Sequence, residues 1–228
     1  MRFLFFAFIA FAAELAILLG PSLAQQSCVT GECHSKFQAG EKTHPQDVSC
    51  ASCHLNTQED HAEGKSKPSL AEGICAGCHK DVLEHRYLHA PVEKGECRLC
   101  HYPHGNMQNK LLPLEYSFKN FINYQEGEYR LCFSCHKREL LMFPDTSFST
   151  GFRDDVRNLH FLHVNKEKRG ISCKLCHGIH GADQPKMMAD AVQFGNWPMP
   201  VNFTKMETGG QCSPGCHRPQ RYDRKGPR

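Results

Sequence analysis

The sequence ECRLCHYPHG, residues 96–105, combines two cysteines and two histidines in one short stretch. Cys97, Cys100 and His101 follow the order C-x-x-C-H, and His104 comes three residues after His101. Nearly the same sequence returns at residues 172–181 as SCKLCHGIHG. A repeated arrangement of this kind indicates a chemical site that the chain builds more than once.

The cysteines of this 228-residue chain all follow one pattern. Each of the 14 cysteines belongs to a pair, and a histidine directly follows the second cysteine of every pair. The seven motifs are Cys28, Cys33 and His34; Cys50, Cys53 and His54; Cys75, Cys78 and His79; Cys97, Cys100 and His101; Cys132, Cys135 and His136; Cys173, Cys176 and His177; and Cys212, Cys216 and His217. A disulfide framework has no need for these histidines, so disulfides do not explain the pattern.

Covalently bound haem c explains both the cysteines and the histidines. Two thiols bind the vinyl groups of the porphyrin as thioethers, and the adjacent histidine binds iron as the proximal ligand. Zinc is the main alternative for paired cysteines, but a zinc site requires no histidine after each pair. The sequence therefore predicts seven haem c groups. Two motifs are longer, with VTGE between Cys28 and Cys33 and SPG between Cys212 and Cys216, and we expect these loops to bulge outward.

The remaining histidines are numerous enough to provide a second axial ligand for every iron. Subtracting the seven proximal histidines from the 15 in the chain leaves eight. A haem iron with two histidine ligands is closed to substrate, whereas an iron with an open face binds small molecules. The predicted distal ligands are His44, His61, His89, His104, His160, His163 and His180, and His85 is the predicted spare. We expect His160, His163 and His180 to serve the three haems attached from Cys132 onward.

The histidines recur at matching places in an internal repeat that holds two haems per unit. His44, His89 and His163 each lie shortly before the second motif of a unit. His85 and His89 are four residues apart, and His160 and His163 are three apart, so a helix would place each pair on one face. We therefore expect helices over residues 76–90 and 152–165. Each would direct two imidazoles to two different haems, and His104 is expected to ligate a neighbouring haem.

The chain resembles the multihaem cytochromes c with doubled CXXCH motifs, a bacterial group used in respiratory electron transfer. The matching sequences are HAPVEKGECRLCHYPHG, YRLCFSCH, NLHFLHVNKEKRGISCKLCHGIHG and TGGQCSPGCHRPQRYDR. This resemblance implies covalent haem c with mostly bis-histidine ligation and a role as a conduit between other redox proteins. Two features depart from the family pattern: His61 lies seven residues after His54, and the pair of His85 and His89 is unusual.

The composition favours a fold built on its cofactors. The chain has one tryptophan and is poor in apolar residues, so haem groups are expected to fill much of the interior. The expected fold is that of a multihaem cytochrome c, mostly irregular, with short α-helices around a chain of closely packed haems and little or no β-sheet. The haem-free stretch at 106–131 predicts a boundary between an N-terminal four-haem region (25–115) and a C-terminal three-haem region (116–228).

The N-terminus predicts export. Residues 1–24 contain Arg2, an apolar run at 3–19 and small residues before Gln25, which is typical of a cleaved signal peptide. An uncleaved membrane anchor is the alternative, although Glu14 interrupts a run that is short for a membrane span. The protein is therefore expected in the periplasm, with association with the outer membrane or an extracellular location left open.

The predicted function is electron transfer, without a catalysed reaction on a substrate. The expected partners are other redox proteins, namely quinol-side or periplasmic donor cytochromes and outer-membrane or extracellular acceptors; a porin partner and self-assembly are left open. The alternative is a multihaem reductase of nitrite, hydroxylamine or a sulfur oxyanion, which needs one open haem. Nucleic acid is not an expected partner, because each ferric haem adds roughly −1 to the formal charge of +3 and makes the loaded protein acidic.

Overall fold

The computed structural model describes residues 34, 44, 48–55, 61, 64–65, 67, 69–104 and 109–226. The chain forms two compact units, Met1–Gln38 and Ala39–Arg228, and the account below concerns the second. The predicted signal peptide, Cys28 and Cys33 lie outside the described residues. The division into haem regions at 25–115 and 116–228 stays a prediction.

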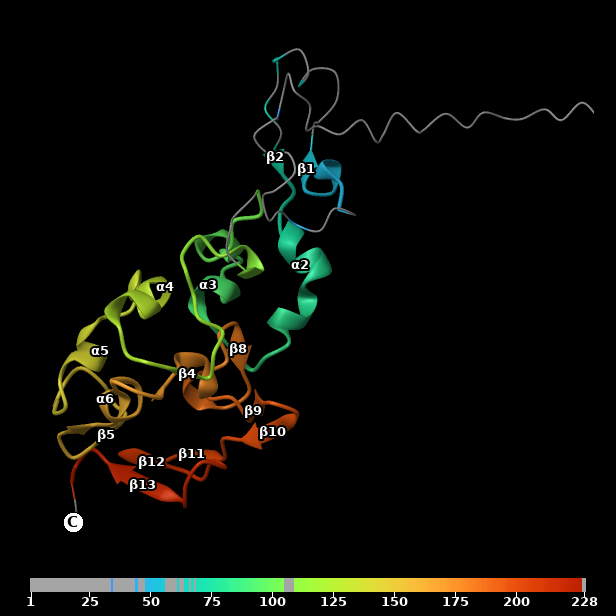
Figure 1. Cartoon of the computed structure of the whole chain (residues 1–228). Helices are drawn as coiled ribbons and strands as arrows, with labels where there is room; N and C mark the ends of the chain where they lie inside the picture. The colour runs from blue at the N-terminus through green and yellow to red at the C-terminus, as the bar shows by residue number, and fades with distance from the viewer. Residues whose placement is uncertain are drawn as a thin grey trace, which may run out of the picture. The chain divides into compact units, whose positions relative to one another are not determined.

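The helices are short, and many of them are built on the cysteine motifs (Figure 1). The α-helices are α2 (Ile74–Cys78), α3 (Ala90–Glu93), α4 (Arg130–Phe133), α5 (Glu139–Met142) and α6 (Leu159–Val164). The 3₁₀ helices are η3 (Cys50–Ser52), η4 (Lys80–Leu83), η5 (Cys97–Leu99), η6 (Asn109–Leu111), η7 (Glu126–Tyr129), η8 (Cys173–Leu175) and η9 (Pro185–Met187). This agrees with the expectation of short helices.

The prediction of a helix over residues 76–90 is wrong, because only short helices, such as α2 and η4, lie in this stretch. The chain leaves helical geometry after η4 and enters strand β3 (Tyr87–Leu88), which pairs antiparallel with β8 (Gly181–Ala182). The backbone N–H of Arg86 donates a hydrogen bond to Oδ1 of Asp183 at 2.8 Å. These contacts come from a segment far along the chain, and such tertiary pairing overrides a local helical pattern. His85 and His89 therefore do not share a helix.

The helix predicted over residues 152–165 is present but shorter. Residues before it form a hairpin of β5 (Arg153–Asp154) and β6 (Arg157–Asn158), and α6 follows. Asn158 is fully buried and caps α6, because its side-chain oxygen accepts a hydrogen bond from the N–H of Phe161. His160 and His163 both lie on α6, as predicted.

The described residues contain more β-structure than expected. The strands are β1 (His54–Leu55), β2 (Ser69–Leu70), β3, β4 (Phe121–Ile122), β5, β6, β7 (Gly170–Ile171), β8, β9 (Ala191–Phe194), β10 (Trp197–Pro200), β11 (Phe203–Lys205), β12 (Gly209–Cys212) and β13 (Gln220–Asp223). Two-stranded antiparallel pairs join β1 to β2, β3 to β8, β4 to β7, β5 to β6 and β9 to β10, and β11, β12 and β13 form a three-stranded antiparallel sheet. The expectation of little or no β-sheet is not confirmed.

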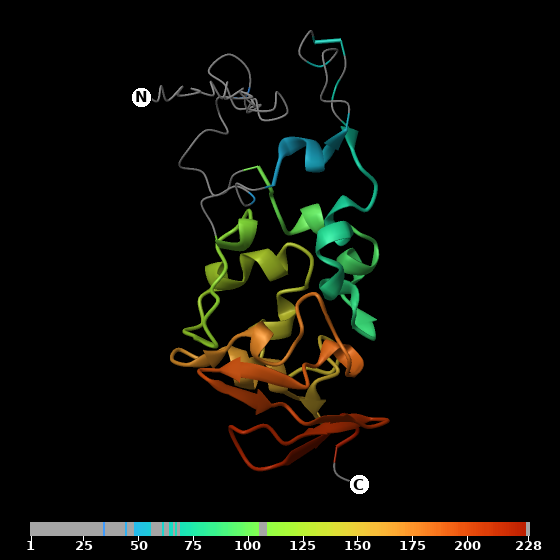
Figure 2. The same ribbon diagram turned by 90° about the vertical axis from the view of Figure 1, so that its right-hand side faces the viewer.

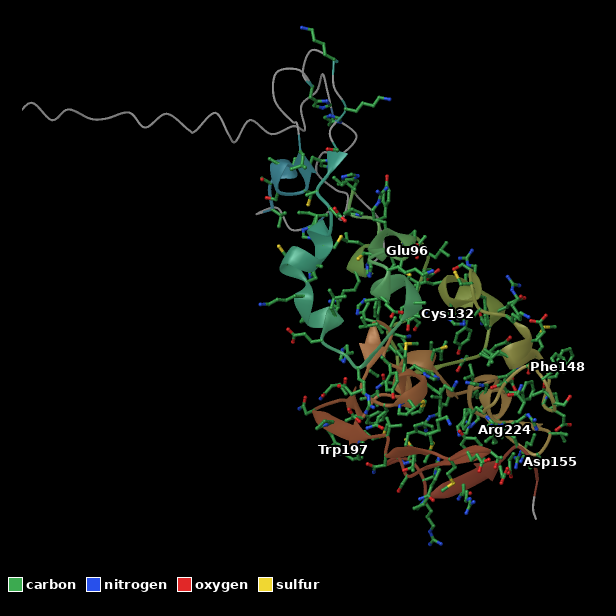
Figure 3. All side chains as sticks on the ribbon, turned by 180° about the vertical axis from the view of Figure 1, so that it is seen from behind. Glu96, Cys132, Phe148, Asp155, Trp197 and Arg224 are labelled. Carbon is green, nitrogen blue, oxygen red and sulfur yellow. The ribbon has the colours of Figure 1, made fainter. Side chains whose placement is uncertain are left out.

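Much of this β-structure lies in the C-terminal part of the chain. The β9–β10 hairpin is followed directly by the β11–β13 sheet, and Figure 2 shows the two next to each other. Strand β13 continues the contact back to the β5–β6 hairpin, because the N–H of Asp155 donates to the carbonyl of Asp223 at 2.7 Å. Figure 3 shows Asp155 and Arg224 at this contact. The last haem motif is therefore held by a small sheet rather than by helices.

The apolar core formed by side chains is thin. Tyr129, Leu141 and Val164 form a cluster that joins η7, α5 and α6, and Tyr124 and Phe133 pack against it. The aromatic side chain of Tyr124 thus belongs to ordinary protein core. Phe118 is exposed. Within the described part of the chain, no helix is both long and apolar enough to cross a membrane.

Candidate haem sites

In each of the five described C-x-x-C-H motifs, the first cysteine lies in a short helical turn. The turns are η3, α2, η5, α4 and η8. In four of them the N–H of the histidine donates to the carbonyl of the first cysteine, at 2.9 to 3.0 Å. Positions i, i+3 and i+4 of a helical turn share one face. The C-x-x-C-H spacing therefore places both sulfurs and the imidazole on the same side of the turn.

Six pairs of histidine rings face one another. In each pair one member directly follows a cysteine motif and the other is a predicted distal ligand. The pairs and their ring-centre separations are His54 and His104 at 5.5 Å, His44 and His79 at 6.0 Å, His89 and His136 at 6.0 Å, His101 and His180 at 6.0 Å, His160 and His177 at 6.4 Å, and His163 and His217 at 6.5 Å. All predicted proximal histidines except His34 appear in this set.

The spacing of these rings fits an iron between them. Two metal–imidazole bonds of about 2 Å, plus roughly 1 Å from each ring centre to its nitrogen, place the ring centres about 6 Å apart. The six separations lie close to this value. The Nε2 atoms of the tightest pair, His54 and His104, face each other at 3.3 Å, closer than the roughly 4 Å that two such bonds to an iron require. Histidines that pack only as core side chains have no reason to keep one separation in all six motifs that have such a pair.

The structure corrects which distal histidine serves which motif. His180 faces His101, and His89 faces His136. The expectation that His160, His163 and His180 all serve the motifs from Cys132 onward is therefore wrong for His180. The reason lies in the pairing of β3 with β8, which brings His180 back to the motif at Cys97.

The pairing follows a regular rule along the repeat. His44, His89 and His163 each precede the second motif of a unit, and each faces the proximal histidine of the first motif of the following unit, or of the terminal motif. The histidines of the C-x-x-C-H-x-x-H sequences, His104 and His180, face a proximal histidine of the preceding unit. Neighbouring units are thus interlocked by histidines in both directions.

His85 is placed differently from the other predicted distal candidates. Its Nδ1 lies 3.7 Å from the carboxylate of Asp183, and its side chain is 36% exposed. This position agrees with the prediction that it is the spare histidine. The roles of His34 as a proximal ligand and His61 as a distal ligand remain predictions, as does ligation at the first motif.

Two backbone carbonyls orient proximal histidines, and the sequence reasoning missed them. Nδ1 of His101 donates to the carbonyl of Lys110 at 2.9 Å, and Nδ1 of His177 donates to the carbonyl of Lys186 at 3.1 Å. Because a carbonyl only accepts, these bonds leave Nε2 of each ring free for a metal. Both lysines have a left-handed backbone, with φ of 61° and 64°. The signal in the sequence was the repeat of NKLL and PKMM at the same distance after the two motifs.

Distal histidines are oriented in the same way. On α6, Nδ1 of His163 donates to the carbonyl of Leu159 at 2.7 Å, and Nδ1 of His160 shares a hydrogen bond with the hydroxyl of Thr150 at 2.8 Å. Burial, followed by the nearby His177 and His163, lowers the pKa of His160 to about 4. His160 is therefore neutral at ordinary pH, which is the form that binds a metal.

The cysteines of successive motifs lie close together. A hydrogen bond with Cys173 and then burial raise the pKa of the Cys132 thiol. Burial, then Cys97 and more weakly Cys53, raise the pKa of Cys75. Burial, then Cys135 and Cys132, raise the pKa of Cys100. Burial, then Cys212 and Cys216, raise the pKa of Cys176 to about 11. The attachment sites from Cys50 to Cys216 therefore neighbour one another in sequence order.

The β9–β10 hairpin packs against the last motif. A side chain at Gly215, inside the spacer of this motif, would lie 2.3 Å from the indole of Trp197. The thiol of Cys216 lies 3.3 Å from the sulfur of Met199. Figure 3 shows Trp197 on this hairpin. The longer spacer of this motif thus provides the surface on which the indole packs.

Comparisons with known proteins agree with this site. Residues 89–140, which contain two of the motifs, match the family described as doubled CXXCH motif. The chain is 24% identical to the high-molecular-weight cytochrome c of Nitratidesulfovibrio vulgaris over 75% of its own length, and it spans 32% of that relative. No solved structure matches the chain. These findings support a multihaem cytochrome c and confirm the resemblance stated from the motifs.

Proposed function

We propose that this protein is a heptahaem electron carrier in which every iron is bound by two histidines. Covalent haem c and electron transfer are supported by the motifs and by the comparisons. The observation that carries the finer proposal is the set of six facing histidine pairs, each made of one motif histidine and one distant histidine. Haem c, when bound, supplies a one-electron redox centre.

The chain's own residues set the properties of each centre. The cysteines would attach the haem covalently, and the facing histidines would bind its iron. Hydrogen bonds from Nδ1 to Lys110, Lys186 and Leu159 hold the imidazole rings in orientation and raise their basicity. The closeness of successive attachment cysteines, such as Cys132 and Cys173, supports a continuous series of centres from the second motif to the last.

The alternative of a multihaem reductase has less support. Such an enzyme needs an iron with one open axial face. Six predicted proximal histidines already face a second histidine. We therefore propose that the protein transforms no substrate, with His61 as the remaining distal candidate.

The location and partners are part of the same proposal. The N-terminus resembles a signal peptide, and haem c requires covalent attachment. Both features support export to the periplasm, and the protein could then reach the outer membrane or the cell exterior. Donors and acceptors would then be other redox proteins. The named relative is a cytochrome c, and this supports a role in electron transfer.

The test is a redox titration of the purified exported protein. Intact mass should show seven covalently bound haems, and full reduction by dithionite should take up seven electrons per chain. The reduced protein should then be reoxidised by a small periplasmic c-type cytochrome, without turnover of nitrite, hydroxylamine or sulfite. Steady turnover of any of these three substrates would overturn the proposal.

A further inference from the structure

We propose that His85 is a reserve axial ligand for the iron at the Cys97–Cys100 motif, held aside by Asp183 while His180 faces His101. This inference rests on the proposed function and adds a role for the one histidine that function leaves unused.

The first observation is the repeat. His85 and His160 occupy matching positions in their units: each is followed along the chain by a second histidine and then by the second cysteine motif. His160 faces His177, the proximal histidine of that second motif. The corresponding target of His85 is His101. That position is taken by His180 instead, which arrives from the next unit.

The second observation is the closeness of His85 to His180. A Cβ built on the neighbouring Gly181 would lie 2.9 Å from Cβ of His85 and 2.8 Å from the carbonyl of Tyr87. The absence of a side chain at Gly181 thus lets the two segments approach. His85 therefore lies against the residue that follows His180, and His180 itself faces the proximal ring of His101.

The third observation is the restraint on His85. Asp183 accepts a hydrogen bond from the N–H of Arg86 with one oxygen, and its other oxygen lies 3.7 Å from Nδ1 of His85. A carboxylate at Nδ1 favours the tautomer whose Nε2 is free to bind a metal. The same contact restrains the ring next to Asp183. Asp183 is thus a positioning residue that both readies and restrains His85.

The exchange is chemically balanced. With haem bound, Nε2 of His85 would bind the iron as Nε2 of His180 leaves it. One imidazole would replace another, so the exchange would change no oxidation state. The last unit differs in one respect. Within the described residues, no later unit supplies a counterpart of His180, so His160 itself faces His177 and no histidine is left in reserve.

The experiment compares holoprotein variants by low-temperature EPR of the ferric form and by carbon monoxide binding to the reduced form. His180→Ala should stay low-spin and bind no carbon monoxide, because His85 replaces the lost ligand. His85→Ala alone should have an unchanged spectrum. The double variant should show one high-spin haem and bind one carbon monoxide per chain. His180→Gln, closer in size, gives the same comparison if His180→Ala fails to incorporate its haems.

The matched control is His160→Ala, which removes the repeat counterpart of His85 and should open one haem. A high-spin His180→Ala variant, with a high-spin His160→Ala control, would overturn the reserve role and leave the proposed function intact. A low-spin double variant would overturn it as well. A low-spin His160→Ala variant would instead contradict the ligand pairs of the proposed function, and the reserve role would fall with them.

Discussion

The imidazole of His54 meets that of His104 end to end, with the ring planes inclined by 16° and the Nε2 atoms 3.3 Å apart. His54 follows the second cysteine motif, whereas His104 follows the fourth. Similar pairs link other distant segments, while the described apolar core is small. The fold is therefore held together largely at the sites where histidines meet.

The first prediction concerns the haem-free chain. Without a metal between the paired rings, the thin core around Tyr129 and Leu141 is too small to stabilise the fold. Chain produced without the haem-attachment machinery should show no cooperative thermal transition by circular dichroism, whereas the holoprotein should show one. A sharp transition in the haem-free chain would contradict this account.

The second prediction concerns the cap of α6. Asn158 accepts from Phe161 and donates to the carbonyls of Leu140 and Phe143 at 3.0 and 2.9 Å. Asn158→Ala should reduce the free energy of unfolding by about 1–3 kcal/mol, because a helix cap is lost and buried carbonyls lose their donor. Denaturant unfolding of the holoprotein measures this. Asn196→Ala, at an exposed position in the β9–β10 turn, is the control and should change little.

The third prediction concerns Thr150, whose hydroxyl bonds Nδ1 of His160 at 2.8 Å. Thr150→Val keeps the volume but removes this bond and makes the imidazole less basic. A less basic ligand stabilises the ferric state less, so the potential of one haem should rise. Spectroelectrochemical titration should show this shift, with Thr204→Val on β11 as the unshifted control. Identical titration curves for the two variants would exclude a tuning role for Thr150.

The fourth prediction concerns the cover of the last motif. In Gly215→Ala the new methyl group would meet the indole of Trp197 at 2.3 Å and force it to move. We expect a loss of about 1–3 kcal/mol in stability. Trp197 fluorescence should also change, because the indole moves relative to the last motif. Gly127→Ala, which meets nothing within 4 Å, should leave both quantities unchanged. Equal behaviour of the two variants would show that the indole does not pack as described.

The sequence predicted the chemistry of the sites better than the architecture around them. The motifs named the residues that the structure brings into pairs, and the placement of His160 and His163 on one helix is confirmed. These features depend on local spacing, because the haem-attachment motif and the face of a helix are each determined by residues a few positions apart.

The features that were wrong depend on distant segments. The helix expected over 76–90 is replaced by strand β3, whose partner β8 comes from a later unit. The same pairing brings His180 to His101 and sets His85 aside. Nothing in the sequence near His85 reports this contact, so its partner and its role needed the structure.

The most direct test of the central claim is the low-temperature EPR and visible spectrum of the purified ferric protein, recorded with and without cyanide or nitrite. If two histidines bind every iron, only low-spin signals should appear, and neither anion should change them. A high-spin signal that accounts for one haem and disappears when an anion is added would contradict the account. Such a result would show an open iron and would favour a reductase.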